Sequence, residues 1–367
     1  MRVVIGGGGT AGHVFPALAV ARTLAERFDA EVGFVGTDRG LEASLVPAAG
    51  FAFTTVESRP LVRKLSLGAF RAPGAALRSV GRCRPAVEEA DVVVGMGGYA
   101  SGPVVLAAMR SRRPIVVHEQ NAVPGLANRI SGRFAKVVAL SFPEAAKFFS
   151  RRIRTEVTGN PVREAIARVP EERDSLAKEA IRELDLEEER RTIVVFGGSQ
   201  GALNIDRALV GACTLLRDRA DLQVLALTGR AHFEHITSSI PTEGALLVRA
   251  LPFLDRMELA YAVADLVVSR AGATTVAEVT VCGVPSLLIP YPYATAGHQD
   301  ANARAVQRSG GASVLLDEHL TPEVLADRVL SLVDHEERLR SMAERAAVFG
   351  TPDAALRVAE LVVEQAG

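Results

Sequence analysis

Short aliphatic and β-branched runs alternate with helix-period patterns along the first half of the chain. Residues 16–27 carry apolar side chains at helical spacing and are predicted to form a helix. Apolar runs without polar alternation predict strands that are buried on both faces, as in a parallel sheet covered by helices. Such runs occur at residues 3–5, 31–35, 91–94, 114–117 and 137–140.

The second half repeats this order after a charge-rich connector at residues 170–191. The amphipathic stretch 353–365 is predicted to be a final helix. No short repeat is present, so the self-similarity lies between the two halves. The sequence therefore predicts an α/β chain with two doubly wound parallel sheets. The strands expected in the second sheet are 192–196, 223–227, 245–249, 266–268 and 286–289.

Composition agrees with two globular domains. A chain of 367 residues is longer than a domain with a single hydrophobic core usually is. A content of 48% apolar and 23% charged residues is typical of a folded protein. The net charge of −1 hides an asymmetry. Residues 1–163 carry 22 Lys and Arg against 12 Asp and Glu, whereas residues 164–367 carry 20 against 31. We expect the basic half and the acidic half to meet different partners.

The cysteines and the ends of the chain indicate a reducing compartment. Cys83, Cys213 and Cys282 are odd in number and far apart, so we expect buried free thiols. The N-terminus enters a strand at once, and we expect no signal peptide. The uncharged stretch 92–109 has the length of a membrane span, but its glycines favour a strand, a loop and a helix start.

Two glycine-rich turns carry the first chemical signal. Residues 2–13 and 192–202 each join an apolar run to glycines and then to a helical pattern. Such a turn presents backbone N–H groups and a positive helix N-terminus to an anion. Two of them, each opening its own βα series, indicate two phosphate-binding domains.

A further polar cluster follows the strand expected at 266–268. Residues 269–278 read S-R-A-G-A-T-T-V-A-E and predict a turn followed by a helix. The N-terminus of that helix can bind a diphosphate, and Glu278 can accept hydrogen bonds from a ribose diol. The alternative is a plain βα turn with a capping acid. The following G-V-P and P-Y-P elements and H-Q-D-A-N at 298–302 bring polar groups to the same sheet edge, which favours the ligand site.

The polar cluster formed by residues 269–278, the G-V-P and P-Y-P elements and residues 298–302 resembles a known signature. It is the donor-sugar signature of two-domain nucleotide-sugar glycosyltransferases of the GT-B type. Residues 7–16, 95–99, 118–121, 159–163 and 197–201 narrow the resemblance to the members of glycosyltransferase family 28 that make the lipid II of peptidoglycan. The resemblance covers almost the whole chain and implies two Rossmann-like domains facing a cleft. The first is residues 1–163, with a terminal helix at about 350–367 packed back on it, and the second is residues 164–349. It also implies a hinge near 159–163.

The resemblance implies inverting transfer of GlcNAc from UDP-GlcNAc to the C4 hydroxyl of MurNAc in lipid I, the undecaprenyl-diphosphate-linked acceptor. It implies neither a metal at the diphosphate nor a cofactor. Leu254 would offer its backbone to uracil, Glu278 would bind the ribose, and Asn121 and Gln299 would bind the sugar. The donor contacts carried over are Thr10, Ala11, Gly12, Asn121, Arg163, Ser199, Leu254, Ala273, Thr274, Thr275, Val276, Ala277, Glu278 and Gln299.

A single displacement needs a base for the acceptor hydroxyl. His13 is the first candidate because it follows the first glycine turn and its ordinary pKa suits the task. Alternatively, His13 caps the helix or orients a phosphate. Glu119 is the second candidate, and His118 is expected to hold its loop. Gly9, Gly97, Gly98 and Tyr99 are a candidate cradle for the acceptor diphosphate, the alternative being a tight βα turn.

Between Glu57 and Glu88 the chain carries seven Lys and Arg and no acid. Only one aromatic residue, Phe70, interrupts this segment, so nucleic-acid binding is not expected. A basic amphipathic segment favours contact with an anionic membrane surface. The resemblance implies that this surface is the cytoplasmic face of a bacterial membrane. Enzymes of a cell-wall synthesis complex are further expected partners. The membrane-contact candidates are Arg63, Lys64, Leu67, Phe70, Arg71, Leu77 and Arg78.

Three rival functions share parts of this pattern. A UDP-GlcNAc epimerase would share fold and donor site but need cleft carboxylates and no membrane face. A dinucleotide-dependent oxidoreductase would need an acid at the end of the second strand, where Gly36 and Thr37 stand. A non-catalytic nucleotide-sugar sensor would keep Glu278 but not need His13. The basic segment and the loop at 118–121 favour the transferase.

Overall fold

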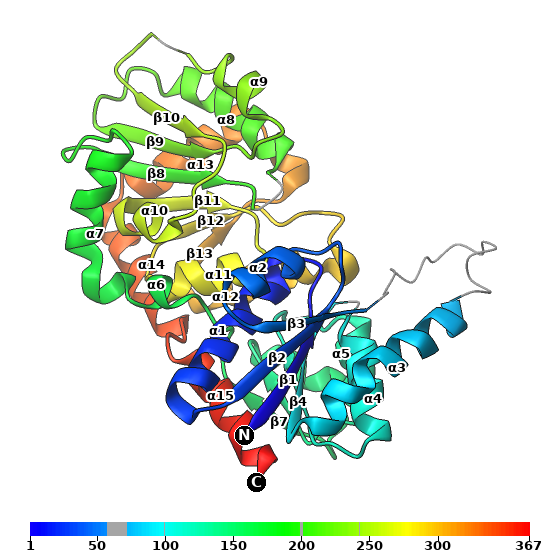
Figure 1. The fold of residues 1–367 in the computed structure, drawn as a ribbon. Helices are drawn as coiled ribbons and strands as arrows, with labels where there is room; N and C mark the ends of the chain where they lie inside the picture. The colour runs from blue at the N-terminus through cyan, green and yellow to red at the C-terminus, as the bar shows by residue number, and fades with distance from the viewer. Residues whose placement is uncertain (57–71, 99, 199–200, 242) are drawn as a thin grey trace. The chain divides into compact units, whose positions relative to one another are not determined.

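The structure is a computed structural model that describes residues 1–56, 72–98, 100–198, 201–241 and 243–367. The chain divides into two compact units. The first comprises Met1–Arg163 together with Pro352–Gly367, and the second comprises Glu164–Thr351. Each unit holds one parallel sheet, as the labels in Figure 1 show.

The first unit has a seven-stranded parallel sheet in the order β3-β2-β1-β4-β5-β6-β7. Its order reverses between β1 and β4, which is the arrangement of a doubly wound fold. Apolar residues on both faces of its central strands explain why these strands appear in the sequence as continuous hydrophobic runs. The strands are β1 (Arg2–Gly7), β2 (Glu31–Gly36), β3 (Ala52–Thr55), β4 (Val92–Gly97), β5 (Ile115–Glu119), β6 (Val137–Leu140) and β7 (Arg154–Val157).

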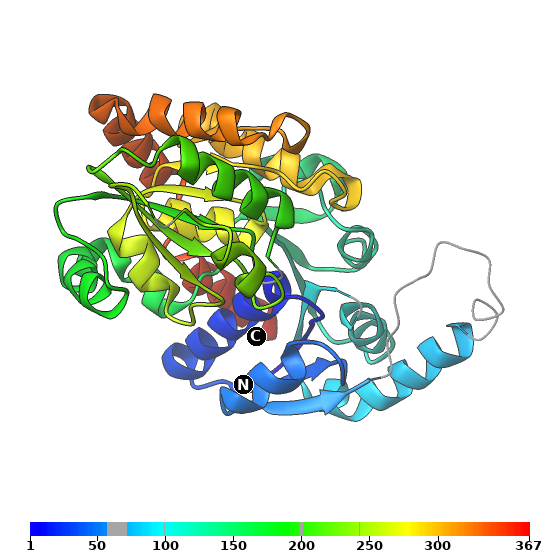
Figure 2. The same cartoon turned by 90° about the horizontal axis from the view of Figure 1, so that it is seen from above.

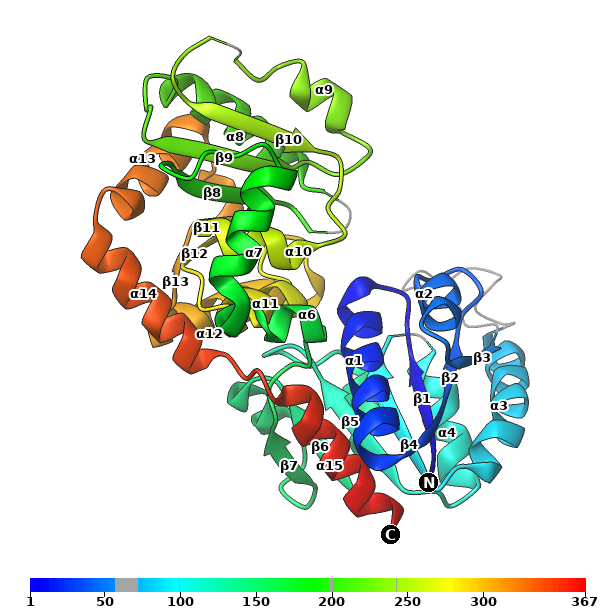
Figure 3. The same cartoon turned by 60° about the vertical axis from the view of Figure 1, so that its left-hand side comes forward.

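Helices cover both faces of this sheet. Helix α1 (Ala11–Phe28) and the C-terminal helix α15 (Ala354–Ala366) pack side by side on one face (Figure 3). Helices α3 (Ala72–Glu89) and α4 (Ser101–Arg110) pack on the other face. The remaining helical segments are α2 (Glu42–Ala48), α5 (Leu126–Ser131) and the 3₁₀ segment η1 (Pro143–Phe148).

The second unit repeats the same strand order. Its six parallel strands are arranged β10-β9-β8-β11-β12-β13, with the reversal between β8 and β11. The likeness between the two halves that the sequence indicates is therefore a likeness of topology. The strands are β8 (Arg191–Phe196), β9 (Leu222–Leu227), β10 (Leu247–Leu251), β11 (Ala264–Ser269), β12 (Ser286–Leu288) and β13 (Ala312–Val314).

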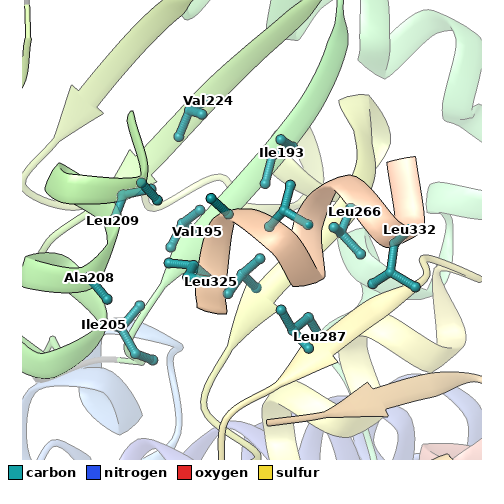
Figure 4. Close-up of a cluster of buried hydrophobic side chains, with 14 of the residues drawn as sticks. Ile193, Val195, Ile205, Ala208, Leu209, Val224, Leu266, Leu287, Leu325 and Leu332 are labelled. Atoms are coloured by element: carbon teal, nitrogen blue, oxygen red, sulfur yellow. The ribbon is translucent and has the colours of Figure 1, made fainter. Parts of the chain in front are cut away.

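One face of the second sheet is buried by helices α8 (Leu203–Leu215), α13 (Pro322–Val333) and α14 (Glu336–Phe349). Helices α8 and α13 are far apart in the sequence but lie side by side (Figure 2). Figure 4 shows Leu325 and Leu332 of α13 among strand residues Val195, Leu266 and Leu287. The other segments are α6 (Glu164–Ala167), α7 (Val169–Glu183), α9 (Phe233–Thr237), α10 (Met257–Val263), α11 (Ala273–Val281), η2 (Thr295–Gly297), α12 (His298–Ser309) and η3 (Asp317–His319).

The structure corrects several predicted element bounds. The strand predicted at 245–249 lies at Leu247–Leu251, and three strands were not predicted, β3, β7 and β13. All four are edge strands with partly exposed residues, and β3, β7 and β13 give no continuous apolar run in the sequence. Helix α1 begins five residues before the predicted start, because Pro16 lies inside the helix rather than in its first turn.

All three cysteines are free and buried, as the sequence predicts. Burial raises the pKa of the Cys83 thiol to about 11 and that of the Cys213 thiol to about 12, which keeps both protonated at neutral pH. Within the described ranges, no helix combines the length and the apolar character needed to cross a lipid bilayer.

Candidate active site

Glycine turns lie at the point where the strand order reverses in each unit. In the first unit the turns after β1 and β4 lie side by side, and in the second unit the turns after β8 and β11 do. Open parallel sheets bind ligands outside the carboxyl ends of their strands at this switch point. Each unit therefore brings its own set of sequence-predicted site residues to one sheet edge.

The first glycine turn leads directly into helix α1. Thr10 precedes the helix in an extended conformation, and its side chain makes no capping hydrogen bond to the helix. The Thr10 carbonyl instead accepts hydrogen bonds from the N–H groups of His13 and Val14. The N–H groups of Ala11 and Gly12 lie in the first turn, where no carbonyl of the helix can pair them. This end of α1 is thus suited to an anion.

His13 lies against Gly97 and Gly98, at the end of β4. A Cβ atom on Gly97 would lie 3.3 Å from His13 Nε2 and 3.2 Å from Asn128 Nδ2. A Cβ atom on Gly98 would lie 2.2 Å from the Gly8 carbonyl oxygen, so the two turns are in direct contact. Gly97 and Gly98 have φ angles of +85° and +77°, which L side chains rarely adopt. Glycine is therefore required here by both space and conformation.

His118 is fixed inside the first unit at the end of β5. Its Nε2 lies 3.1 Å from the Gly159 carbonyl oxygen, and Gln120 Nε2 lies 3.1 Å from its Nδ1. These partners select the tautomer that carries its proton on Nε2. Burial lowers the pKa of His118 to about 4, the Gly159 carbonyl opposes this, and the charge of His13 lowers it further. His118 is neutral at physiological pH and holds the loop to Gly159.

The Glu119 carboxylate is surrounded by donors from its own loop and from α5. Oε1 accepts the backbone N–H of Asn121 at 2.8 Å, and Oε2 accepts Asn128 Nδ2 at 2.9 Å and the N–H of Gly125 at 3.3 Å. Burial raises its pKa, and these hydrogen bonds offset part of that effect. Both carboxylate oxygens are engaged in shaping the loop that carries Asn121.

In the second unit, helix α11 begins directly after the S-R-A-G turn. Gly272 precedes it in an extended conformation, and Ala273 and Thr274 form its first residues. The Thr274 hydroxyl is buried and has no hydrogen-bond partner among the described residues. Glu278 lies one turn further along the helix, is 6% exposed, and accepts a 2.8 Å hydrogen bond on Oε2 from the Tyr261 hydroxyl. A helix N-terminus and a buried oriented carboxylate thus stand on one helix.

A buried ion pair holds the turn before α11. Arg270 and Asp317 are 2.5 Å apart, with side chains only 9% and 8% exposed. Arg270 Nη1 also donates to the carbonyl oxygens of Ile289 and Pro290. From helix α12, Asn302 Nδ2 donates to the Ala271 carbonyl at 3.2 Å. These contacts from three other segments of the unit fix the S-R-A-G turn.

The other predicted donor residues lie as follows. Gln299 Oε1 accepts the backbone N–H of Tyr291 at 2.9 Å, which ties the start of α12 to the P-Y-P segment. Leu254 is half-buried in the loop after β10. The Arg163 guanidinium lies 5.0 Å from the centre of the Phe15 ring in the first unit.

Several predicted residues lie outside the described residues. They include Ser199 and Tyr99, the side chain of Leu77, and the membrane-contact candidates Arg63, Lys64, Leu67, Phe70 and Arg71. Arg78 is described and exposed on α3. Within the part of the chain that the structure describes, no group of three His, Cys, Asp or Glu side chains is placed to hold a metal ion.

Sequence reasoning missed four residues that shape these sites: Glu42, Asn128, Asp206 and Arg270. Each is buried, and each makes contacts that depend on segments distant in the chain or on helix starts that were not predicted. The available signal was weak, because an acid or amide near a turn is common on protein surfaces. Only Arg270 lay within a quoted motif.

Comparisons with known proteins agree with this arrangement. Residues 3–140 match the glycosyltransferase family 28 N-terminal domain, and residues 192–358 match the C-terminal domain of that family. The whole chain is 40% identical over 375 residues to 99% of the UDP-N-acetylglucosamine–N-acetylmuramyl-(pentapeptide) pyrophosphoryl-undecaprenol N-acetylglucosamine transferase of Halothermothrix orenii.

Two solved structures distinguish similarity within the family from similarity of fold alone. The structure of MurG from Acinetobacter baumannii is 30% identical, has a TM-score of 0.79, and each chain covers 99% of the other. UDP-GlcNAc 2-epimerase from Neisseria meningitidis is 13% identical with a TM-score of 0.68, covering 99% of this chain and 100% of its own, and shares the fold alone. This chain belongs to glycosyltransferase family 28.

Proposed function

We propose that this chain transfers GlcNAc from UDP-GlcNAc to the C4 hydroxyl of MurNAc in lipid I, forming the β-1,4 link of lipid II and releasing UDP. The observation that carries the proposal is that each unit has a glycine turn and a helix N-terminus at its own switch point. Two substrates that each contain a diphosphate require two such sites. The fold is of the GT-B type, and the full-length relationship reported above favours transfer over epimerisation.

The second unit is the proposed donor domain. The N-terminus of α11 and the buried Thr274 hydroxyl receive the diphosphate of UDP-GlcNAc, and Glu278 accepts hydrogen bonds from the ribose diol. Leu254 contributes its backbone to uracil recognition, and Gln299 contacts the sugar. As the C1–O bond to UDP breaks, charge develops on the β-phosphate. Helix N–H groups stabilise that charge without the reorganisation that water would need.

The first unit is the proposed acceptor domain. The acceptor oxygen attacks C1 of GlcNAc on the side opposite UDP, which inverts the configuration, and His13 takes the hydroxyl proton. His13 is partly exposed at the start of α1, unlike His118, which is neutral and buried. Glu119 is the weaker candidate because its carboxylate already accepts hydrogen bonds from Asn121, Gly125 and Asn128. We therefore assign Glu119 to holding the sugar-binding loop.

The glycine turns after β1 and β4 are proposed to bind the acceptor diphosphate. Gly97 and Gly98 expose backbone close to the His13 ring, so a diphosphate held there would place the attached MurNAc near the base. Gly9 belongs to the first of these turns, where its own N–H donates to the Glu42 carboxylate. Tyr99, the next residue in the sequence after Gly98, lies outside the described residues. Thr10, Ala11 and Gly12 lie at the neighbouring end of α1, from which they would approach the donor sugar.

We also propose that the first unit docks on an anionic membrane surface. The basic composition of the segment between Glu57 and Glu88 supports this, and so do exposed apolar side chains at α5 and just after it. There Leu126, Ile130 and Phe134 are 64%, 48% and 47% exposed. Beside them, Arg129 and Arg133 line a hollow of about 230 Å³ together with Phe148, Phe149 and Ser150. Exposed apolar side chains among arginines are typical of reversible membrane contact.

A reconstituted transfer assay tests the proposed reaction. Purified protein is incubated with UDP-GlcNAc, with and without a lipid I analogue of shortened lipid chain, and UDP release and product are measured. The proposal requires UDP release that depends on the analogue, and a disaccharide product with a β-1,4 link. Release without the analogue would indicate hydrolysis, and interconversion of UDP-GlcNAc with its C2 epimer would indicate the epimerase.

A further inference from the structure

A carboxylate that no motif predicted lies inside the first glycine turn. Glu42 is the first residue of α2 and is 1% exposed. Its Oε2 accepts the backbone N–H of Gly9 at 2.7 Å. Its Oε1 accepts both the N–H of Thr37 at 2.9 Å and the Thr37 hydroxyl at 2.7 Å. One side chain therefore joins the turn after β1 to the end of β2.

Three glycines from different segments make room for this side chain. A Cβ atom on Gly8 would lie 2.3 Å from the Glu42 carboxyl carbon. A Cβ atom on Gly36 would lie 2.5 Å from Glu42 Cγ, and one on Gly40 would lie 2.0 Å from Oε2. Any other residue at these positions would collide with the carboxylate, so the backbone is closed around it.

The Glu42 carboxylate is held by hydrogen bonds rather than by a countercharge. Burial raises its pKa, but the donors Gly9 and Thr37 lower the pKa more, so that it falls below the ordinary value. None of the ion pairs among the described residues includes Glu42. A buried carboxylate held in this way is ionised at neutral pH and occupies the position of an anion within the turn.

We propose that Glu42 is a positioning residue, whose carboxylate acts as a built-in anion that sets the shape of the first glycine turn. It takes the Gly9 N–H group that a bound phosphate would otherwise use. The Gly8 carbonyl is then held against Gly98, and His13 is held over Gly97. The inference deepens the proposed function. It predicts that N–H groups other than that of Gly9 hold the acceptor diphosphate.

Glu42→Gln tests the inference, because an amide cannot accept from both sides and its NH₂ group would face the Gly9 N–H. We expect kcat/KM for the lipid I analogue to fall at least tenfold, while the affinity for UDP stays within twofold of the wild type. The control is Asp91→Asn. Asp91 Oδ2 accepts the backbone N–H of Arg2 at 2.7 Å, at the opposite end of the same strand, and its loss should leave transfer unchanged.

Formate rescue separates a positioning anion from a merely structural side chain. Glu42→Ala leaves a space lined by the Gly9 and Thr37 donors, which formate can fill. We expect formate to raise the transfer rate of Glu42→Ala at least fivefold. The transfer rate of the wild type should not change. If the Glu42 variants do not fold, Thr37→Val, which removes one donor, should lower kcat/KM two- to fivefold with UDP affinity unchanged.

The outcomes separate this inference from the proposed function. A wild-type protein without lipid I-dependent UDP release would refute the proposed function. An active wild type with Glu42→Gln of equal or higher activity would refute the inference, since higher activity would mean that Glu42 only repels the acceptor diphosphate. A folded Glu42→Ala variant whose transfer rate formate does not raise would also overturn it. If the Glu42 variants fail to fold, a Thr37→Val variant with the kcat/KM of the wild type would overturn it.

Discussion

The hydroxyl of Tyr261 donates a 2.8 Å hydrogen bond to Oε2 of Glu278, and both side chains are buried. The bond fixes the orientation of the carboxylate that we assign to the ribose. Removing the hydroxyl in Tyr261→Phe leaves a buried acceptor less satisfied, at a cost of about 1 kcal/mol. We therefore expect UDP to bind roughly three- to tenfold more weakly, measured by isothermal titration calorimetry.

Tyr293→Phe is the matched control for that measurement. Tyr293 is 82% exposed, so loss of its hydroxyl should leave UDP affinity unchanged. An unchanged affinity in Tyr261→Phe would show that the orientation of Glu278 does not matter for the nucleotide, and would remove Glu278 from the ribose site.

His13→Ala tests the assignment of the base. We expect kcat to fall by about 10²–10⁴-fold, the usual contribution of a general base, while the KM for UDP-GlcNAc changes little. The thermal unfolding midpoint should stay close to that of the wild type, because His13 is partly exposed. Steady-state kinetics with the lipid I analogue and a thermal melt supply both numbers.

Glu119→Gln provides the contrast. Its carboxylate accepts hydrogen bonds from Asn121, Gly125 and Asn128, so the amide should lower the unfolding midpoint as well as the activity. Near-normal turnover in His13→Ala, combined with a stable but inactive Glu119→Gln, would reverse the two roles.

The raised pKa of the buried Asp206 predicts that the free energy of unfolding depends on pH. Burial raises its pKa from 3.8 to about 7, although the Ala202 N–H and Arg270 favour the ionised form. Between these pH values the folded state holds a proton that the unfolded state has lost. The contribution of Asp206 to stability is therefore complete below pH 4 and is lost as the pH rises through 7. Above pH 7 the folded protein contains a buried charge.

Asp206→Asn should consequently be more stable than the wild type at pH 8, by on the order of 2 kcal/mol, and of similar stability at pH 4 to 5. Urea unfolding at both pH values measures this. Comparing the two proteins cancels the opposite effect of His118, whose pKa burial lowers to about 4. Asp218→Asn, with a side chain 87% exposed, is the control. A gain that is equal at both pH values would contradict the assignment.

Central strands were predictable from the sequence, and edge strands were not. β1, β6 and β8 are buried on both faces and appear as unbroken apolar runs. β3, β7, β10 and β13 lie at the sheet edges with partly exposed residues, and all four were missed or misplaced. A residue pattern reports burial, so it loses its meaning where a strand has a neighbour on one side only.

The candidate site shows the same division. Glycine turns and the S-R-A-G motif are local in sequence, so the switch points of both sheets could be located in advance. Glu42 and Asn128 make hydrogen bonds to segments that are folded around them, and burial raises the pKa of Asp206. Their partners become neighbours only in the folded unit, and no local pattern marks them.

Membrane docking predicts a charge-dependent association with lipid. The protein should float with vesicles that contain anionic lipid, and less so at high salt, because exposed charges are screened. Arg133→Gln should weaken binding about fivefold, since one basic residue near such a surface contributes about 1 kcal/mol. Arg133 lines the hollow beside the exposed residue Ile130.

Arg22→Gln removes the same charge from an exposed position on α1 and should leave vesicle binding unchanged. Gln substitutions at Arg63 and Lys64 test the basic segment in the same assay. Binding that ignores salt and lipid charge, or equal effects of Arg133→Gln and Arg22→Gln, would count against the docking face.

The most direct test of the central claim follows the anomeric carbon through one turnover. UDP-GlcNAc labelled with ¹³C at C1 is incubated with the lipid I analogue, and the product is read by NMR. The account predicts UDP release that depends on the analogue, and a product whose labelled carbon has the coupling of a β-glycosidic link to C4 of MurNAc. An α-linked product, label recovered only as free GlcNAc, or equal UDP release without the analogue would contradict it.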